Sequence, residues 1–125
     1  MTENEISYIL RGAIFRVYNN LGPGLLESVY VAALKHELHK NGLKTKTQVP
    51  VPVIYDNIKL ELGFRLDVIV NDMVILEIKS VESLLPVHKK QLLTYLRLTN
   101  KKLGLLVNFN TEDMARGITR IVNNL

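Results

Sequence analysis

The spacing of apolar residues predicts two amphipathic helices in the first third of the chain. Between Ile6 and Leu21, apolar residues recur every three or four positions, which is the period of a helix with one buried face. Gly22-Pro23-Gly24 interrupts the pattern, because proline cannot continue a helix and glycine tolerates the turn. A second helix with the same spacing is expected from Leu26 to about Asn41-Gly42.

The middle of the chain alternates between apolar and polar residues, the pattern of β-strands. Residues 49–55 predict one strand, and the two prolines within it favour a sheet edge or an irregular start. A long alternating run follows over 58–70, and a shorter one over 74–79. Asn71-Asp72 between these runs is typical of a turn, so the two strands should pair as a hairpin.

The last third of the chain predicts a helix, a strand and a final helix. Pro86 suits the first position of a helix that continues to about Thr99. Residues 103–109 are nearly all apolar, as in a buried strand in the parallel direction. Thr111 is a good N-cap for a last helix, whose apolar side would carry Met114, Ile118, Ile121, Val122 and Leu125. The order ααβββαβα predicts a single α/β domain over residues 1–125, with a mixed sheet and helices on both faces.

Composition narrows the classes of protein. The 125 residues include 47% hydrophobic and 22% charged residues, as in an ordinary globular domain. The absence of cysteine excludes disulfides, zinc-thiolate sites, iron–sulfur clusters and cysteine nucleophiles. No stretch approaches the ~20 apolar residues of a membrane span, and the N-terminus lacks a signal-peptide pattern. We therefore expect a cytoplasmic protein.

Basic residues exceed acidic ones, with a net charge of +4 and a pI near 9.4. This surplus is compatible with a polyanionic partner but does not require one. The basic residues form two clusters along the chain, Lys35, Lys40, Lys44 and Lys46, and then Lys89, Lys90, Arg97, Lys101 and Lys102.

Acidic residues on the predicted hairpin are the strongest candidates for a functional site. By the two-residue period of a strand, Glu77 and Lys79 share one face, and Asp67 points to the corresponding face of the preceding strand. A three-residue loop at 71–73 would place Asp67 across from Glu77, and Arg65 across from Lys79. Facing Cβ atoms lie about 5 Å apart, where like charges repel. Two such carboxylates call for a cation, and oxygen ligands suit Mg²⁺ or Mn²⁺.

A surface ladder of salt bridges is the competing interpretation of these charges. In that arrangement Lys79 neutralises Glu77 and Arg65 faces it, so that no metal is needed. Against it, Ile69 and Ile75 lie on the charged face. Apolar residues there imply that the face is covered, and buried charges are rarely found without a partner.

Residues on the second and third predicted helices are weaker candidates. Glu27 opens the second helix, where a glutamate ordinarily completes a cap and favours the positive end of the dipole; the alternative is a third acid near the metal. His88, Gln91 and Tyr95 share one face of the third helix. They either meet solvent and cap a loop, or they contact a phosphate or a base. Tyr30 fits the core better than a site.

These residues together resemble a known group of proteins. Asp67 with Glu77-Ile78-Lys79 resembles the PD-(D/E)XK nuclease superfamily, and Gly24-Leu25-Leu26-Glu27-Ser28-Val29-Tyr30 matches the motif that names its GxxExxY protein family. The similarity includes Gln91 and Tyr95, which match a Gln-x-x-x-Tyr element, and extends to 104–109. Leu66 stands where the superfamily's eponymous proline would precede Asp67, a departure that many members share.

The resemblance implies a restriction-endonuclease-like fold and a Mg²⁺- or Mn²⁺-dependent nuclease acting on DNA, with RNA as the alternative. Asp67, Glu77 and the carbonyl of Ile78 would hold the metal, which activates a water and offsets charge on the phosphate. Lys79 would position that water or stabilise the transition state. The remaining implied site residues are Glu27 beside the metal-bound water and His88, Gln91 and Tyr95 at the substrate backbone.

Two other functions stay open at this point. The scaffold could bind nucleic acid without cutting it, or it could be a protein-interaction module whose basic surface is incidental. A homodimer is compatible with the small size of the chain. The sequence does not distinguish cutting at ends from internal cutting.

Overall fold

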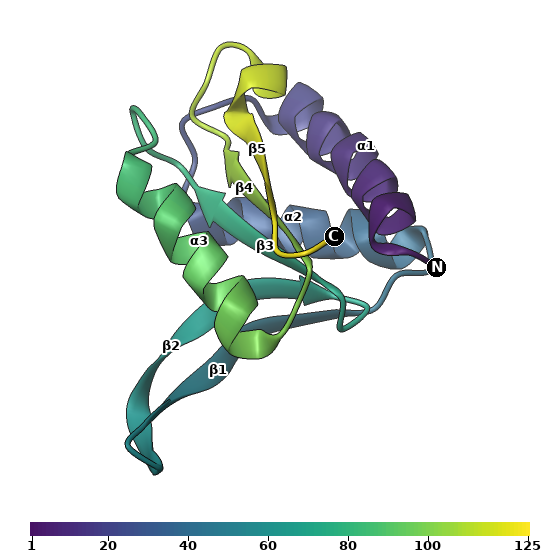
Figure 1. Cartoon of the computed structure of the whole chain (residues 1–125). Helices are drawn as coiled ribbons and strands as arrows, with labels where there is room; N and C mark the ends of the chain where they lie inside the picture. The colour runs from purple at the N-terminus through teal and green to yellow at the C-terminus, as the bar shows by residue number, and fades with distance from the viewer.

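A five-stranded mixed sheet forms the centre of the protein (Figure 1). The computed structural model describes the backbone of residues 1–125 and the side chains of residues 1–60 and 63–125. Strand order follows the chain, β1-β2-β3-β4-β5; β3 and β4 are parallel and the other neighbours antiparallel. The elements are α1 (Glu3–Leu21), α2 (Glu27–Lys40), β1 (Thr45–Tyr55), β2 (Ile58–Val70), β3 (Val74–Lys79), α3 (Pro86–Thr99), β4 (Leu103–Asn108), the 3₁₀ helix η1 (Met114–Gly117) and β5 (Ile118–Val122).

The helices cover both faces of the sheet, which confirms the predicted α/β fold class. On one face, α1 and α2 pack against inward-facing residues of β2, β3 and β4 around the fully buried Leu10, Leu34 and Leu76. On the other face, α3 packs its Leu92 and Leu96 against those strands. In Figure 1 α3 crosses in front of the sheet while α2 runs behind it. The two apolar layers explain why β3 and β4 are buried along almost their whole length.

Capping residues define both ends of α1. Thr2 caps α1 in a capping box with Glu5, which satisfies free amide groups at the helix start. Gly22 then ends the helix with φ 70°, a left-handed value that favours glycine. None of the helices in the described part of the chain is long and apolar enough to cross a membrane.

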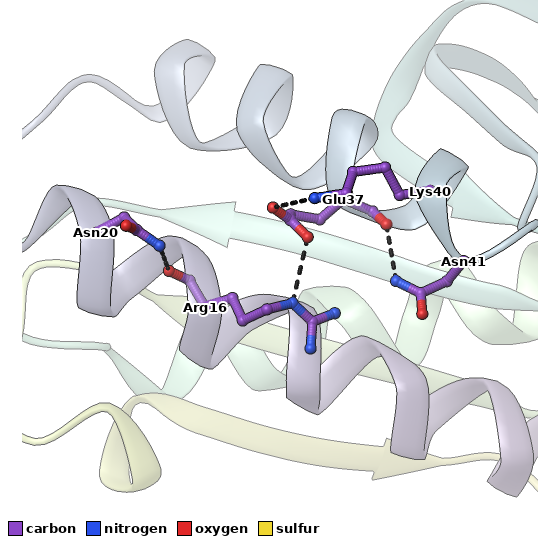
Figure 2. Close-up of polar contacts among 5 residues, drawn as sticks. All are labelled: Arg16, Asn20, Glu37, Lys40 and Asn41. Atoms are coloured by element: carbon purple, nitrogen blue, oxygen red, sulfur yellow. Dashed lines mark hydrogen bonds and ion pairs between the residues drawn. The ribbon is translucent and has the colours of Figure 1, made fainter.

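A small polar network joins the exposed sides of α1 and α2 (Figure 2). Arg16 Nε lies 3.2 Å from Glu37 Oε2, and Lys40 Nζ lies 3.7 Å from the other carboxylate oxygen. A hydrogen bond from Arg16, together with the nearby positive charges, lowers the pKa of Glu37. Asn41 donates to the Glu37 carbonyl and Asn20 to the Arg16 carbonyl. These contacts are solvated, so they orient the helix pair and add little stability.

The long hairpin of β1 and β2 extends beyond the helices (Figure 1). Its turn consists of Asp56 and Asn57, both with φ above 50°, as such residues tolerate in tight hairpins. The prolines of β1 predicted an edge strand, and β1 does lie at one edge of the sheet. The inner end of this hairpin, where β2 meets β3, carries the predicted site.

The prediction of a final helix is wrong. Asp113, rather than Thr111, caps a 3₁₀ helix of four residues, and the chain then continues as strand β5 along the free edge of β4. Thr111 instead accepts a hydrogen bond from the hydroxyl of Tyr18 on α1. Two physical causes oppose the helix. Ile118, Thr119, Ile121 and Val122 are β-branched and form helices poorly, and the buried strand β4 needs backbone partners that only a strand can supply.

Gly117 should be essential for this turn from η1 into β5. A Cβ atom there would lie 2.5 Å from the carbonyl oxygen of Asn108 and 2.8 Å from Met114 Cε. Gly117→Ala is therefore expected to lower the free energy of unfolding by about 1–3 kcal/mol in urea titrations. The matched control is Gly12→Ala inside α1, where the nearest atom is 3.4 Å away and alanine should add about 0.5–1 kcal/mol. Equal effects at the two sites would contradict this account of the turn.

Candidate active site

Strands β2 and β3 part beside the predicted acidic residues. Their pairing begins at Val70 and Val74, which leaves the three-residue loop that the sequence predicted, and continues only to Val68 and Leu76. Beyond that pair of residues, backbone N–H groups donate to side-chain carboxylates rather than to carbonyl groups of the opposite strand. Ile78 N donates to Asp67 Oδ2 at 2.8 Å, and Asp67 N donates to Glu77 Oε1 at 3.2 Å. The two carboxylates therefore lie side by side, as expected, in the wedge between the separating strands.

The acid pair is covered rather than exposed. Glu77 is 6% exposed, and Ile69 and Ile75 on the same face are buried, as the sequence analysis anticipated. Tyr95 of α3 belongs to the same apolar cluster as Ile75. The helix thus shields one side of the pair from water.

This environment disfavours two negative charges. Burial, the neighbouring charge of Asp67 and a hydrogen bond with its side chain raise the pKa of Glu77 to about 8, against the weaker opposing effects of the backbone hydrogen bond from Asp67 and of the Lys79 charge. Burial, followed by the charges of Glu77 and Asp67, also raises the pKa of the Tyr95 hydroxyl. The charges of both acids therefore act on the Tyr95 hydroxyl. Among the described side chains, no ion pair joins either acid to a positive charge.

The free oxygens of this pair suit a divalent cation. Among the described residues, one oxygen of each acid, Asp67 Oδ2 and Glu77 Oε1, accepts a hydrogen bond from a backbone N–H group, and the other oxygen of each accepts none. No fully buried polar side-chain atom in residues 1–60 and 63–125 lacks a partner, so the two oxygens that accept none are not completely buried. The same part of the chain contains no group of three or more His, Cys, Asp or Glu residues placed to hold a metal. A cation here would have two carboxylates, with its remaining ligands from backbone or water.

The salt-bridge ladder is not what the structure shows. Ion pairs among the described side chains do not include Lys79 or Arg65. Arg65 is exposed and donates to the carbonyl of Gln48 in β1. Lys79 is half-buried, near enough to influence the pKa of Glu77. Its ammonium group therefore remains available beside the acid pair.

Of the two interpretations of Glu27, the side-chain cap is not found, although the residue does lie in the first turn of α2. Leu26 occupies the N-cap position of α2 without a side-chain cap, and Glu27 is the first helical residue. Its Oε2 instead accepts a hydrogen bond at 3.3 Å from the amide of Ser80, directly after Lys79. Ser80 Oγ also donates to the carbonyl of Leu25. The start of α2 is thus joined to the end of β3, which brings Glu27 to the edge of the site.

Asn108 is a supporting residue that the sequence analysis did not single out. Its buried side chain accepts from Val81 N at 3.1 Å and donates to Val81 O at 2.9 Å. Phe109 N bonds the carbonyl of Lys79. These bonds hold the chain on either side of Ser80. A lone asparagine at the end of an apolar strand was the available signal.

The three candidates on α3 have different surroundings. Tyr95 is nearly buried, and its ring stacks on Phe64 of β2 with centroids 3.8 Å apart. Gln91 lies one turn earlier and is exposed. His88 accepts a hydrogen bond from Leu85 N through Nδ1, which caps the start of the helix. Tyr30, expected in the core, is fully buried, and its hydroxyl bonds the Gly22 carbonyl and the Leu25 amide.

A cleft of about 450 Å³ opens next to Asp67, between α2 and β1. The α2 side carries Glu27, Ser28, Val31, Ala32 and Lys35, and the β1 side carries Thr47 and Gln48. Helical spacing could have predicted that Lys35 lies on the same face of α2 as Glu27. No sequence pattern predicted that Gln48 lies near the site. A larger hollow of about 610 Å³ surrounds the β2–β3 turn and contains none of the predicted site residues.

The fold and this acid–lysine arrangement define the class of protein. A mixed sheet covered by helices on both faces, with its acids where two strands part, is a restriction-endonuclease-like architecture. The family model of the PD-(D/E)XK nuclease superfamily matches residues 4–121. The chain belongs to this superfamily. Neither a curated protein nor a solved structure gives a significant match.

The raised pKa of Glu77 has a measurable consequence for stability. An acid whose pKa is raised in the folded state stabilises fully below its ordinary value near 4.5, and that contribution is lost as the pH rises through about 8. In the presence of a chelator, the wild-type protein should lose stability from about pH 5 to 8. Glu77→Gln keeps the hydrogen-bond acceptor without the charge, so it should be more stable at pH 8 by on the order of 2 kcal/mol.

Urea unfolding at both pH values measures this difference. Glu112→Gln, at an exposed position, is the matched control and should follow the wild type throughout. If Glu77→Gln and the wild type lost stability in parallel, Glu77 would not be the source of the pH dependence.

Proposed function

We propose that the protein is a metal-dependent nuclease that hydrolyses phosphodiester bonds, with DNA as the first substrate to test and RNA as the second. The observation that carries this proposal is the pair of carboxylates where β2 and β3 separate, each with one oxygen that accepts no backbone hydrogen bond and with Lys79 next to them. Membership of the nuclease superfamily supports it. The match of residues 24–30 to the GxxExxY motif further favours that branch of the superfamily.

The metal ligands in this proposal are Asp67, Glu77 and the carbonyl oxygen of Ile78. The first two offer the hard oxygen atoms that Mg²⁺ and Mn²⁺ prefer. The Ile78 N–H donates to Asp67, and because the N–H and C=O of one residue in a strand point to the same side, the Ile78 carbonyl faces the β2 side as well. A divalent ion bound there would lower the pKa of a water molecule and offset negative charge on the phosphate.

The other residues act on the water and the substrate. Lys79 places an ammonium group beside the acids, where it stabilises the additional negative charge of the transition state or orients the attacking water. Glu27, held at the end of β3 by Ser80, accepts a hydrogen bond from water on the α2 side. Tyr95 and the exposed Gln91 contact the substrate backbone from α3. His88 supports that helix and has its second ring nitrogen free for a phosphate.

Cleavage assays with labelled DNA and RNA in Mg²⁺ or Mn²⁺ test the catalytic part. The wild type should cut at least one substrate, and Lys79→Ala should lower the rate about 100-fold or more, as expected when transition-state charge loses its partner. Lys102→Ala is the matched control. Lys102 precedes the end of β4 that pairs with Val74, whereas Lys79 lies at the other end of β3. Background-level cutting by both the wild type and Lys79→Ala would reject catalysis.

Calorimetry with Mn²⁺ tests the metal site without any substrate. The wild type should show one binding event that Asp67→Asn abolishes, because the amide cannot replace a carboxylate ligand. Asp72→Asn in the β2–β3 turn is the control, since its left-handed φ of 57° also suits asparagine. Nucleic-acid binding that is indifferent to Mn²⁺ would favour a binding module that does not cut.

A further inference from the structure

We infer that the cleft between α2 and β1 binds the base and sugar of an unpaired nucleotide next to the scissile phosphate, so that the preferred substrate is single-stranded or has a single-stranded end. This inference rests on the proposed nuclease function and specifies its substrate class. Both elements that form the cleft can be followed in Figure 1, where α2 runs behind β3 and β1 lies below it. The position, lining and charge of the cleft each support the inference.

The position of the cleft links it to the acid pair. Asp67 lines it and also holds the amide of Ile78, so the same residue belongs to both. Glu27 lines the cleft as well and is bonded to the segment after Lys79. A nucleotide whose phosphate lies at the acids can therefore place its base and sugar here. The volume of about 450 Å³ is within the usual ~300–1,000 Å³ of sites for small molecules.

The lining suits a nucleotide that is partly apolar and partly polar. Val31 and Ala32 offer apolar surface from α2, and Ser28 and Thr47 offer hydroxyl groups at the sides. A base has flat apolar faces and a polar edge, so it needs both kinds of contact. Lys35, at the outer end of the α2 side, adds a positive charge. It takes part in none of the ion pairs among the described side chains, so it is available for a phosphate.

Gln48 has an unusual backbone for a residue within a strand. Its φ is 52°, in the left-handed region that costs a non-glycine residue free energy. The neighbouring residues Thr47 and Val49 pair with Val68 and Leu66, whereas Gln48 itself has no partner in the ladder. Arg65 holds this conformation through the Gln48 carbonyl. Gln48 also lines the cleft, where its side-chain amide can hydrogen-bond a base edge.

A double helix cannot use such a cleft without distortion. Its bases are stacked and paired inside the duplex, and exposing one costs a few kcal/mol. An unpaired nucleotide has already lost these contacts, so binding in the cleft is gained without that cost. The structure therefore favours single strands, overhangs or gaps over blunt duplexes.

Fluorescence anisotropy in EDTA measures this preference without cleavage. The probes are a labelled 12-nucleotide DNA strand, its blunt duplex, and the duplex with a single-stranded overhang. The wild type should bind the strand and the overhang at least ~5-fold more tightly than the blunt duplex. Lys35→Ala should weaken binding to the strand several-fold and reduce its salt dependence by about 0.7 per lost contact. Lys102→Ala removes the same charge at the distant end of β4 and should change little.

A second variant separates the side chain of Gln48 from its backbone. Gln48→Gly retains the left-handed conformation at no steric cost, so its folding should be preserved while its affinity for unpaired DNA falls. Equal affinity of the wild type for single strands and blunt duplexes, with Lys35→Ala no weaker than Lys102→Ala, would overturn the inference. That result could occur even if duplex DNA were cut. A retained preference for unpaired DNA in a protein that cuts nothing would support the cleft and reject the nuclease.

Discussion

The proposed function depends on one unfavourable interaction, the close approach of two carboxylates in a covered site. Asp67 and Glu77 are held together because each accepts a hydrogen bond from the backbone beside the other. These bonds replace part of the pairing between β2 and β3, so the acids cannot separate without widening the gap between these two strands. Burial and mutual repulsion are relieved by protonation of Glu77 or by a bound cation. The same pair thus accounts for a pH-sensitive stability and, under the proposed function, would hold the metal.

Other parts of the fold hold this pair in place. Helix α3 covers it with Tyr95, whose ring is fixed by stacking on Phe64. From the opposite side, α2 is joined to the end of β3 through Glu27 and Ser80, and Asn108 fixes the following residue. Precise placement of catalytic groups requires this kind of secondary support. A cleft lies next to Asp67 between α2 and β1, and under the proposed function the substrate would approach from there.

The sequence predicted the hairpin, the acid pair and its cover for reasons that are local. Two-residue alternation placed Asp67, Glu77 and Lys79 on one face, and the short turn at 71–73 set the register that joins them. Apolar residues on that face indicated burial. The same reasoning did not succeed for Glu27, because its partner is the amide of Ser80, 53 residues away. It did not succeed for residues 111–125 either, where the need of β4 for a strand partner outweighed an apparent helical period.

The sequence by itself determined which segments alternate, which acids share a strand face, and that no cysteine chemistry is possible. These properties depend on neighbours along the chain, so periodicity and turn chemistry suffice to read them. Only the tertiary structure decided that Glu27 contacts the residue after β3 and that Asn108 bonds the residue that follows. It also decided that Gln48 and Lys35 line a cleft beside Asp67. Those contacts join separate elements, and their geometry follows from how helices and sheet pack together.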